Sequence, residues 1–326
     1  MNRLALNCAF GKLSMMRRDE ILGLERRVLA AVDQLCPSRL AVAVSGGVDS
    51  LALAEALRRL GRKPLVLHVN HGWRGRQSNR DEQFARDWCA GHGLPFASTT
   101  LTVTTPRTEA AARVARWRFF TAELRRRKIK TLMLAHHADD LVETFFLQLL
   151  RGAGPDGLAS LTMQRHMDGI ELLRPLLAFG KGELKKLARH WRLAWREDTT
   201  NVSDDYFRNR VRRRLLPYLK KLGGRDPLTV VRRTAQIIAD ENVFWEQELP
   251  KVWGRRLAVG FFAGKAVAWR RRALRAWLAA QGVADADFAQ IEAVRGLLEQ
   301  AHPSRVNLSR DRHCQRRAGF LFVDSR

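Results

Sequence analysis

The chain has 326 residues, and its 58 lysines and arginines against 33 aspartates and glutamates give a formal net charge of +25. A hydrophobic fraction of 46% supports packed cores and excludes wholesale disorder, and the length suggests two domains. The positive charge favours nucleic acid or another polyanion as a partner, with a solvated basic surface as the simpler alternative.

Short apolar runs alternate with helical patterns between residues 40 and 177. The runs predict strands at 40–44, 65–69, 95–103 and 131–135, and the patterns between them predict helices at 51–60, 80–91, 109–128 and 139–150. Apolar strands separated by helices are typical of a parallel sheet that is covered on both faces. We therefore expect a doubly wound α/β fold.

The rest of the chain predicts a smaller, mainly helical domain. A helix at 183–190 is followed by a polar loop, a basic run at 208–214 and a break at 223–227. Helices are expected beyond it at 228–249, 269–281 and 288–300, with short strands within 306–323. We expect an N-terminal extension and helix at 1–36, the α/β domain at 37–225 and the smaller domain at 226–326.

The spacing of the cysteines and the length of the apolar runs indicate the cellular compartment in which the protein is expected. Cys8, Cys36, Cys89 and Cys314 are isolated, without the Cys-x-x-Cys spacing of zinc, iron–sulfur or redox sites, which favours a reducing compartment. No apolar run approaches the roughly 18 to 20 residues that span a bilayer, and residues 1–18 do not match a signal peptide. We expect a cytoplasmic protein without a membrane partner.

A phosphate-binding turn is the most specific feature of the sequence. It follows an apolar strand, precedes a helix and consists of Ser45, Gly46, Gly47, Val48, Asp49 and Ser50. Glycines allow close backbone approach to an anion, and a helix N-terminus favours phosphate. The sequence is not a Walker A loop, and Asp49 suits a metal that bridges to phosphates. An ordinary capped strand-to-helix turn is the alternative.

This turn resembles the PP-loop of the N-type ATP pyrophosphatases, which cleave ATP to AMP and pyrophosphate. Further segments make most of 40–325 similar to the tRNA(Ile)-lysidine synthetase family. The resemblance implies ATP and Mg²⁺ as cofactors, with the six loop residues binding ATP and Asp49 and Asp139 as candidate magnesium ligands. It makes 37–225 the ATP-binding catalytic domain, and 226–326 a linker helix with a small tRNA-binding domain.

Two segments add histidines and arginines to the expected nucleotide pocket. His68 and His71 lie at the end of the second strand, where the resemblance places them near ATP. The alternatives are a buried structural role for His68 and a loop position for His71. Arg113 and Arg116 share a helix face, from which they could neutralise the triphosphate or the transition state. Solvated charges are the alternative. The resemblance favours Arg113 as catalytic and Arg116 as ATP-binding.

The motif from His136 to Thr144 joins the strand at 131–135 to a helix. Asp140 and Glu143 are three residues apart, so both carboxylates can converge on one cation, either hydrated Mg²⁺ or an ammonium group. For Asp139 and Asp140, the alternative is that they are acids at the helix N-terminus that stabilise the helix dipole. The resemblance implies that Asp140 and Glu143 recognise L-lysine, that both are catalytic together with Asp49, and that His136 belongs to the ATP site.

A polar and basic segment completes the pattern. It resembles the family's Glu-Asp-x-x-Asn and Arg-Asn-x-x-Arg motifs and supplies the candidate tRNA-binding residues Asn201, Arg208, Asn209, Arg210 and Arg212. Arginine suits bidentate phosphate contacts, and asparagine can reach base edges. Without the neighbouring motifs this run would be interpreted as a solvated face.

The resemblance implies ATP-dependent ligation of lysine to C2 of cytidine at the first anticodon position of the tRNA(Ile) with a CAU anticodon. The expected intermediate is an adenylated cytidine, and the by-products are AMP and pyrophosphate. A PP-loop tRNA thiolase, a small-molecule PP-loop synthetase and a non-catalytic RNA-binding protein are the alternatives. A homodimer is left open.

Overall fold

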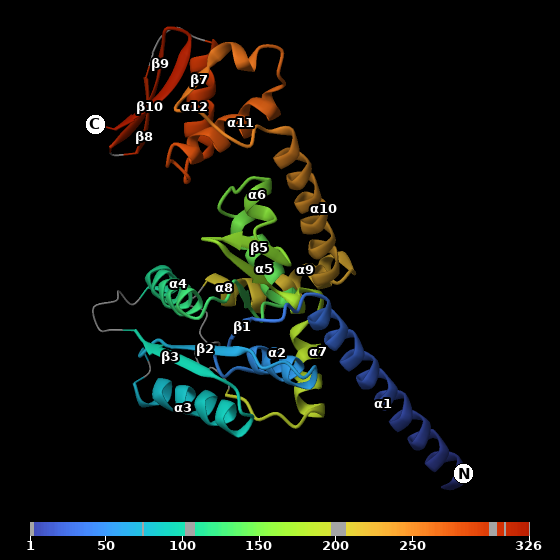
Figure 1. Cartoon of the computed structure of the whole chain (residues 1–326). Coiled ribbons are helices and arrows are strands. Elements are labelled where there is room, and N and C mark those ends of the chain that lie inside the picture. The colour runs from blue at the N-terminus through green and yellow to red at the C-terminus, as the bar shows by residue number, and fades with distance from the viewer. Residues whose placement is uncertain are drawn as a thin grey trace. The chain divides into compact units, whose positions relative to one another are not determined.

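The computed structural model describes residues 3–73, 75–101, 108–196, 207–299, 305–309 and 311–325, with the side chains of the first helix from residue 18 onward (Figure 1). The chain forms two compact units, Met1–Ile238 and Ala239–Arg326, and each is described by itself. The division falls within helix α10 (Pro227–Glu248), whereas the sequence places the domain boundary ahead of that helix.

The first unit is built on a six-stranded sheet with the order β3-β2-β1-β4-β6-β5. Its strands are β1 (Ala41–Ala43), β2 (Leu65–Asn70), β3 (Phe96–Thr100), β4 (Thr131–Met133), β5 (Gln164–Met167) and β6 (Ile170–Leu173). All neighbours pair in parallel except β5 and β6. Because β1 lies between β2 and β4, the loops that follow β1 and β4 meet at the switch point of the sheet.

Helices cover both faces of this sheet, as the sequence predicts (Figure 1). The helices of this unit that precede α10 are α1 (Arg3–Gln34), α2 (Val48–Arg59), α3 (Arg76–Gly91), α4 (Glu109–Arg126), α5 (Ala138–Leu149), α6 (Pro155–Leu158), α7 (Lys181–His190), α8 (Phe207–Arg210) and α9 (Leu216–Gly223). Val42 and Met133 pack with α1, α2, α3 and α7, while Ala41 and Leu132 pack with α4 on the other face. This alternation is the period of two expected of a strand.

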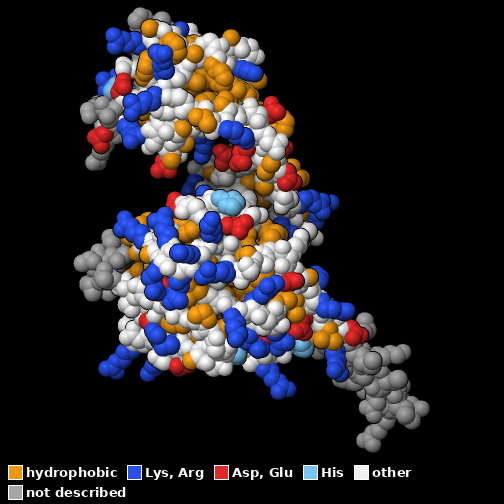
Figure 2. Space-filling model, in the orientation of Figure 1, with side chains coloured by type: hydrophobic (Ala, Val, Ile, Leu, Met, Phe, Trp, Pro, Cys, Tyr) orange, Lys and Arg blue, Asp and Glu red, His pale blue; other side chains and the backbone are white. Residues whose placement is uncertain are grey.

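Three features of this unit add to the sequence analysis. The hairpin of β5 and β6 was not predicted, because β5 is exposed and polar and therefore lacks an apolar run. Such a charged edge discourages pairing with other chains. Lysine and arginine side chains gather over the region of α4 (Figure 2). Among the described residues, no helix combines the length and apolarity needed to cross a bilayer.

The second unit packs two helices against a four-stranded antiparallel sheet with the order β7-β10-β9-β8. Its elements are β7 (Arg256–Ala258), α11 (Val267–Ala280), α12 (Phe288–Glu299), β8 (Arg305–Ser309), β9 (Arg312–Arg317) and β10 (Phe320–Ser325). Trp277 is fully buried in its core and donates its indole N–H to the carbonyl of Gly254 at 3.0 Å. The sheet gives this unit more strand than the mainly helical domain that the sequence predicts.

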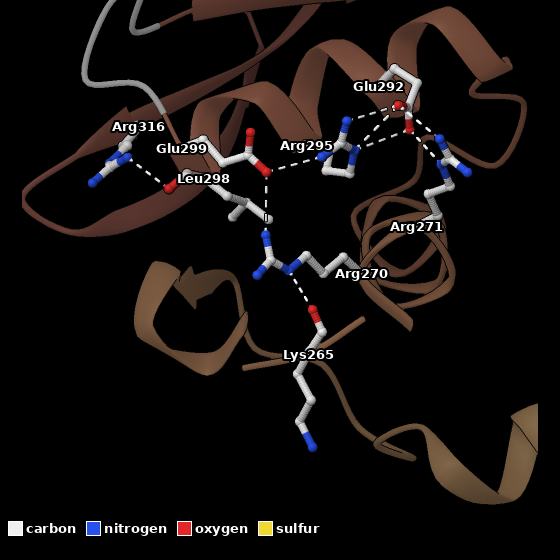
Figure 3. A network of polar contacts seen from close by, with 8 residues as sticks. All are labelled: Lys265, Arg270, Arg271, Glu292, Arg295, Leu298, Glu299 and Arg316. Atoms are coloured by element: carbon white, nitrogen blue, oxygen red, sulfur yellow. Dashed lines mark hydrogen bonds and ion pairs between the residues drawn. The ribbon is translucent and has the colours of Figure 1, made fainter. Parts of the chain in front are cut away.

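Ion pairs join α11 to α12 in this unit (Figure 3). The Glu292 carboxylate accepts two hydrogen bonds from Arg271, at 2.7 and 3.0 Å, and further ones from Arg295. Glu299 accepts from Arg295 and Arg270, and Arg316 donates to carbonyls at the end of α12. The hydrogen bonds from Arg271 and Arg295 lower the pKa of Glu292 to about 2.

This network predicts an acid-sensitive contribution to stability. Glu292 has a lower pKa in the folded chain than its ordinary value of about 4.3, so its contribution is present above that value and is lost as pH falls toward 2. We expect Glu292→Gln to lower the free energy of unfolding by no more than about 1 kcal/mol at pH 7, because exposed ion pairs are screened. The difference should vanish near pH 2 in denaturant titrations. Equal differences at pH 7 and pH 2 would contradict the assignment.

Candidate active site

The PP-loop folds back on itself between β1 and α2. Gly46 has φ +89°, a left-handed conformation that favours glycine. The backbone N–H of Ser45 donates to the Ser50 hydroxyl at 3.1 Å, and that hydroxyl donates to the Gly47 carbonyl at 2.9 Å. The backbone N–H of Arg196 holds the carbonyl of Gly46 at 3.0 Å. These contacts fix the loop at the N-terminus of α2, where a phosphate is favoured.

The loop after β4 brings a second group of side chains to the same place. His137 precedes the first turn of α5, and its backbone N–H donates to Asp140 Oδ2 at 3.0 Å. Asp139 Oδ2 accepts the backbone N–H of Lys181, at the start of α7, at 2.8 Å. Acids in the first turn also interact favourably with the helix dipole. Asp139 and Asp140 are therefore placed to stabilise the dipole of α5, and they also lie at the switch point of the sheet.

The His137 side chain, 2% exposed, lies among three carboxylates. Its Nε2 is 3.5 Å from Asp49 Oδ2 and 3.5 Å from Asp140 Oδ2, and its Nδ1 is 3.4 Å from Asp139 Oδ2. Burial opposes a charge, but the contacts with Asp139, Asp49 and Asp140 outweigh it and raise the pKa of His137 to about 9. His137 is therefore an imidazolium at neutral pH, which joins the PP-loop to α5.

Asp49 retains one carboxylate oxygen that fits a metal ion. Oδ2 contacts His137 and lies 3.6 Å from Lys181 Nζ, whereas Oδ1 is buried and has no hydrogen-bond partner in the described part of the chain. Burial works against ionisation, but His137 and Lys181 hold the pKa of Asp49 below its ordinary value. Ionised carboxylate oxygens are the ligands that Mg²⁺ prefers. Among the described residues, no group of three or more His, Cys, Asp or Glu side chains is arranged so that it could hold a metal ion by itself, so water and substrate oxygens would complete the shell of an ion at Asp49.

Arginines gather on the other side of the motif, around His136. Arg174, at the end of β6, donates from Nε to His136 Nδ1 at 3.1 Å. Burial first, and then the charges of Arg174, Arg116 and Arg208, lower the pKa of His136 to about 4 against the opposing effect of Asp140. The positive charges of Arg165 and Arg113 likewise lower the pKa of Arg174. The predicted pair Arg113 and Arg116 thus belongs to a larger cationic cluster, which suits an anionic ligand.

Glu143 is fully buried and does not face solvent as an open acid. Its Oε1 accepts Arg212 Nε at 2.5 Å, and its Oε2 lies 3.6 Å from Arg208 Nε. Burial raises the pKa of Glu143, and the positive charge of Arg212 works against that shift. Arg212 belongs to a π-helical turn (Val211–Leu215), and such turns often occur at functional sites. Two of the arginines expected at RNA are therefore directed toward α5.

The remaining predicted residues have different surroundings. The His68 ring is buried and its Nδ1 donates to the Val44 carbonyl, just after β1, at 2.8 Å. His71 lies beside Trp73, with 5.4 Å between ring centroids. Asn209 is buried and Arg210 is exposed. Asn201 lies outside the described residues.

Three residues of the site were not predicted. The sequence analysis assigned no role to His137, although its place two residues before Asp139 is visible in the sequence. Lys181 and Arg174 come from α7 and the end of β6, and no local pattern marks them. They reach the site only because β6 lies beside β4.

The buried pair of Glu143 and Arg212 predicts a stability change. We expect Arg212→Gln to lower the free energy of unfolding by about 3 kcal/mol at pH 8, because it leaves a buried carboxylate without its main partner. The loss should shrink toward pH 5, where the raised pKa of Glu143 lets the carboxyl take up a proton. Denaturant titrations at both pH values measure this.

The exposed neighbour Arg213 provides the control, since Arg213→Gln should change stability by less than about 0.5 kcal/mol. Adding Glu143→Gln to the Arg212→Gln variant should restore part of the lost stability. A loss of the same size for Arg212→Gln and Arg213→Gln would contradict the pairing.

Known proteins share this architecture and these segments. Residues 22–219 match a family model described as the PP-loop domain, and residues 257–322 match the TilS substrate binding domain. A solved U34-tRNA thiolase, NcsA from Methanococcus maripaludis with its [4Fe-4S] cluster, superposes with a TM-score of 0.55 at 20% identity. The match covers 67% of this chain and 78% of that one, and it supports the fold alone.

Curated relatives identify the family. The tRNA(Ile)-lysidine synthase of Solibacter usitatus is 35% identical over 224 residues, which cover 68% of this chain and 50% of the relative. The chain thus spans about half the length of that relative. The tRNA(Ile)-lysidine synthase of Gloeobacter violaceus is 34% identical over 299 residues, which cover 88% of this chain and 91% of the relative. With its PP-loop, its acidic motif after β4 and this match over nearly the whole of a relative, the chain belongs to the tRNA(Ile)-lysidine synthase family.

Proposed function

We propose that the protein is a tRNA-modifying ligase that joins L-lysine to C2 of cytidine at the first anticodon position of the tRNA(Ile) with a CAU anticodon. ATP activates the cytidine, and AMP and pyrophosphate are released. The observation that carries this proposal is the meeting of Asp49 from the PP-loop with Asp140 from α5 at His137. It unites a nucleotide loop with acids suited to an ammonium substrate. The names of the relatives support tRNA lysidine modification as the reaction.

The first step is adenylation of the cytidine. Its O2 attacks the α-phosphate of ATP, an O–P bond forms, and the bond to the β-phosphate breaks as pyrophosphate leaves along the PP-loop. Guanidinium groups offset the charge that develops on the phosphate oxygens, and Arg113 and Arg116 of the cationic cluster around His136 and Arg174 are the proposed residues. A Mg²⁺ ion held by Asp49 and Asp139 would stabilise the leaving pyrophosphate.

Lysine transfer follows at the acidic side of the site. The ε-amine has an ordinary pKa of about 10.4, so it arrives as an ammonium group and must lose a proton before it attacks C2 and expels AMP. Asp140 and Glu143 are the proposed recognition residues. Since Glu143 is already paired with Arg212, the incoming ammonium group shares or replaces that guanidinium. Exchange of one cation for another keeps the buried carboxylate compensated.

A sulfur-transfer reaction of the thiolase type is less well supported. Such chemistry needs a reactive thiolate or a cluster ligand. Burial raises the pKa of Cys36, and it raises the pKa of Cys89 and Cys314 to about 12, which disfavours the thiolate form. These three cysteines have the properties of structural residues.

Substitution of the acidic pair tests the proposal directly. We expect Asp140→Asn to abolish lysine incorporation into the CAU-anticodon tRNA(Ile), while the affinity for the tRNA changes by less than about threefold, because the charge is lost at the lysine site. Incorporation of radiolabelled lysine and filter binding measure the two quantities. Asp33→Asn, an exposed change on α1, is the control. Normal lysine incorporation by Asp140→Asn would refute this assignment.

Binding of the tRNA body is proposed for the basic segment from Arg208 to Lys221. Lys220 and Lys221 are exposed on α9, so the double substitution to Gln should weaken binding to all tRNAs alike. If both contact phosphates, the slope of log affinity against log salt concentration should fall by about 1.8. The double substitution of Lys185 and Lys186 on α7 is the matched control. An unchanged slope for the α9 variant would remove this segment from the interface.

A further inference from the structure

Arg174 is a buried arginine whose surroundings are cationic. Its side chain is 4% exposed, and the charged groups that act on its pKa are Arg165 and Arg113. It donates from Nη1 to the Thr162 carbonyl at 2.8 Å and from Nε to His136 Nδ1 at 3.1 Å. A guanidinium buried among other guanidinium groups costs free energy, so its retention calls for a specific task.

The contact with His136 fixes the chemical form of that ring. A guanidinium can only donate hydrogen bonds, so Nδ1 must be the acceptor and cannot carry a proton. The proton of the neutral imidazole is therefore on Nε2. The charges of Arg116 and Arg208 act in the same direction, because they oppose a second proton on the ring. Arg174 thus selects one of the two neutral tautomers of His136.

The arginines around the His136 ring indicate which kind of ligand atom accepts a hydrogen bond from its Nε2–H. Phosphate oxygens accept hydrogen bonds and carry negative charge, so they suit both the cationic cluster and a fixed donor. His136 follows β4, next to β1 and its PP-loop, at the edge of the sheet where nucleotides bind. An imidazole of fixed tautomer adds a directional donor, and it adds no further charge to an already cationic cluster.

We propose that Arg174 is a positioning residue that holds His136 as an Nε2–H donor to a phosphate oxygen of the bound nucleotide. The inference rests on the proposed ATP-dependent function. No covalent step is assigned to either residue. His136 contacts the nucleotide, and Arg174 acts through His136.

Nitrogen NMR of histidine-labelled full-length protein tests the tautomer and the contact without catalysis. We expect the unprotonated type of signal for Nδ1 of His136 and the protonated type for Nε2. A non-hydrolysable ATP analogue should shift the Nε2–H signal in the unmodified protein, and Arg174→Gln should mix the tautomers and diminish the shift. A proton on Nδ1, or an unshifted Nε2–H signal in the unmodified protein with the analogue bound, would overturn the proposal. Because this readout needs no lysine transfer, it separates the proposal from a failure of the ligase function.

A double-mutant cycle separates positioning from a structural role. A glutamine at position 136 carries an N–H near the place of Nε2 and has no tautomer to select. We expect Arg174→Gln to lower kcat by about tenfold or more in the parent protein, but by less than about threefold in the His136→Gln background. Arg174→Lys guards against misfolding, and because an ammonium group also only donates hydrogen bonds, it should retain more of kcat than Arg174→Gln. Arg126→Gln, an exposed change on α4, is the control. Equal losses in both backgrounds would mean that Arg174 has only a structural role.

Discussion

The candidate site depends on the contact of the His137 imidazolium with Asp49, Asp139 and Asp140. Three carboxylates that converge at the end of a sheet repel one another, and a buried cation between them offsets that repulsion. Because Asp49 comes from the PP-loop and the other two acids from α5, the same contact sets the distance between the loops that follow β1 and β4. Lys181 adds a second positive group from α7. The same electrostatic contacts therefore hold both the nucleotide loop and the acidic motif in place.

Two adjacent histidines divide the site into regions of opposite charge. The backbone of His137 is extended, with φ −122° and ψ 179°, and in extended chain successive side chains point to opposite sides. His137 reaches the carboxylates and is charged, whereas His136 reaches the arginines and is neutral. An ammonium substrate and a phosphate substrate need these two environments side by side. His136 and His137, which follow β4, provide both environments from adjacent residues.

The sequence predicted the parts of the fold that depend on local pattern. Apolar runs placed the strands at Ala41, Leu65 and Thr131, and the turn at Ser45 marked the phosphate loop. The pattern failed where tertiary contacts decide, since the β5–β6 hairpin is polar on its exposed side. It also failed for Lys181 and Arg174, which follow β6 and reach the motif only through sheet pairing. A buried partner for Glu143 was likewise invisible, because Arg212 is 69 residues away and stands in a run that resembles a solvated face.

Arginine suits positions 174 and 212 better than lysine would, because both side chains are withdrawn from water to some extent. Arg174 is buried and Arg212 is partly buried, and burial disfavours the charged form of any base. The pKa of Arg174 falls to about 10, which still leaves it fully charged at neutral pH. The same reduction would bring a lysine from about 10.4 to roughly 8, so that part of the population would be neutral. The charge of +25 therefore does more than attract a polyanion. Part of it consists of two permanent cations, the buried Arg174, which donates to His136, and the partly buried Arg212, which compensates Glu143. The exposed remainder is available to a polyanion.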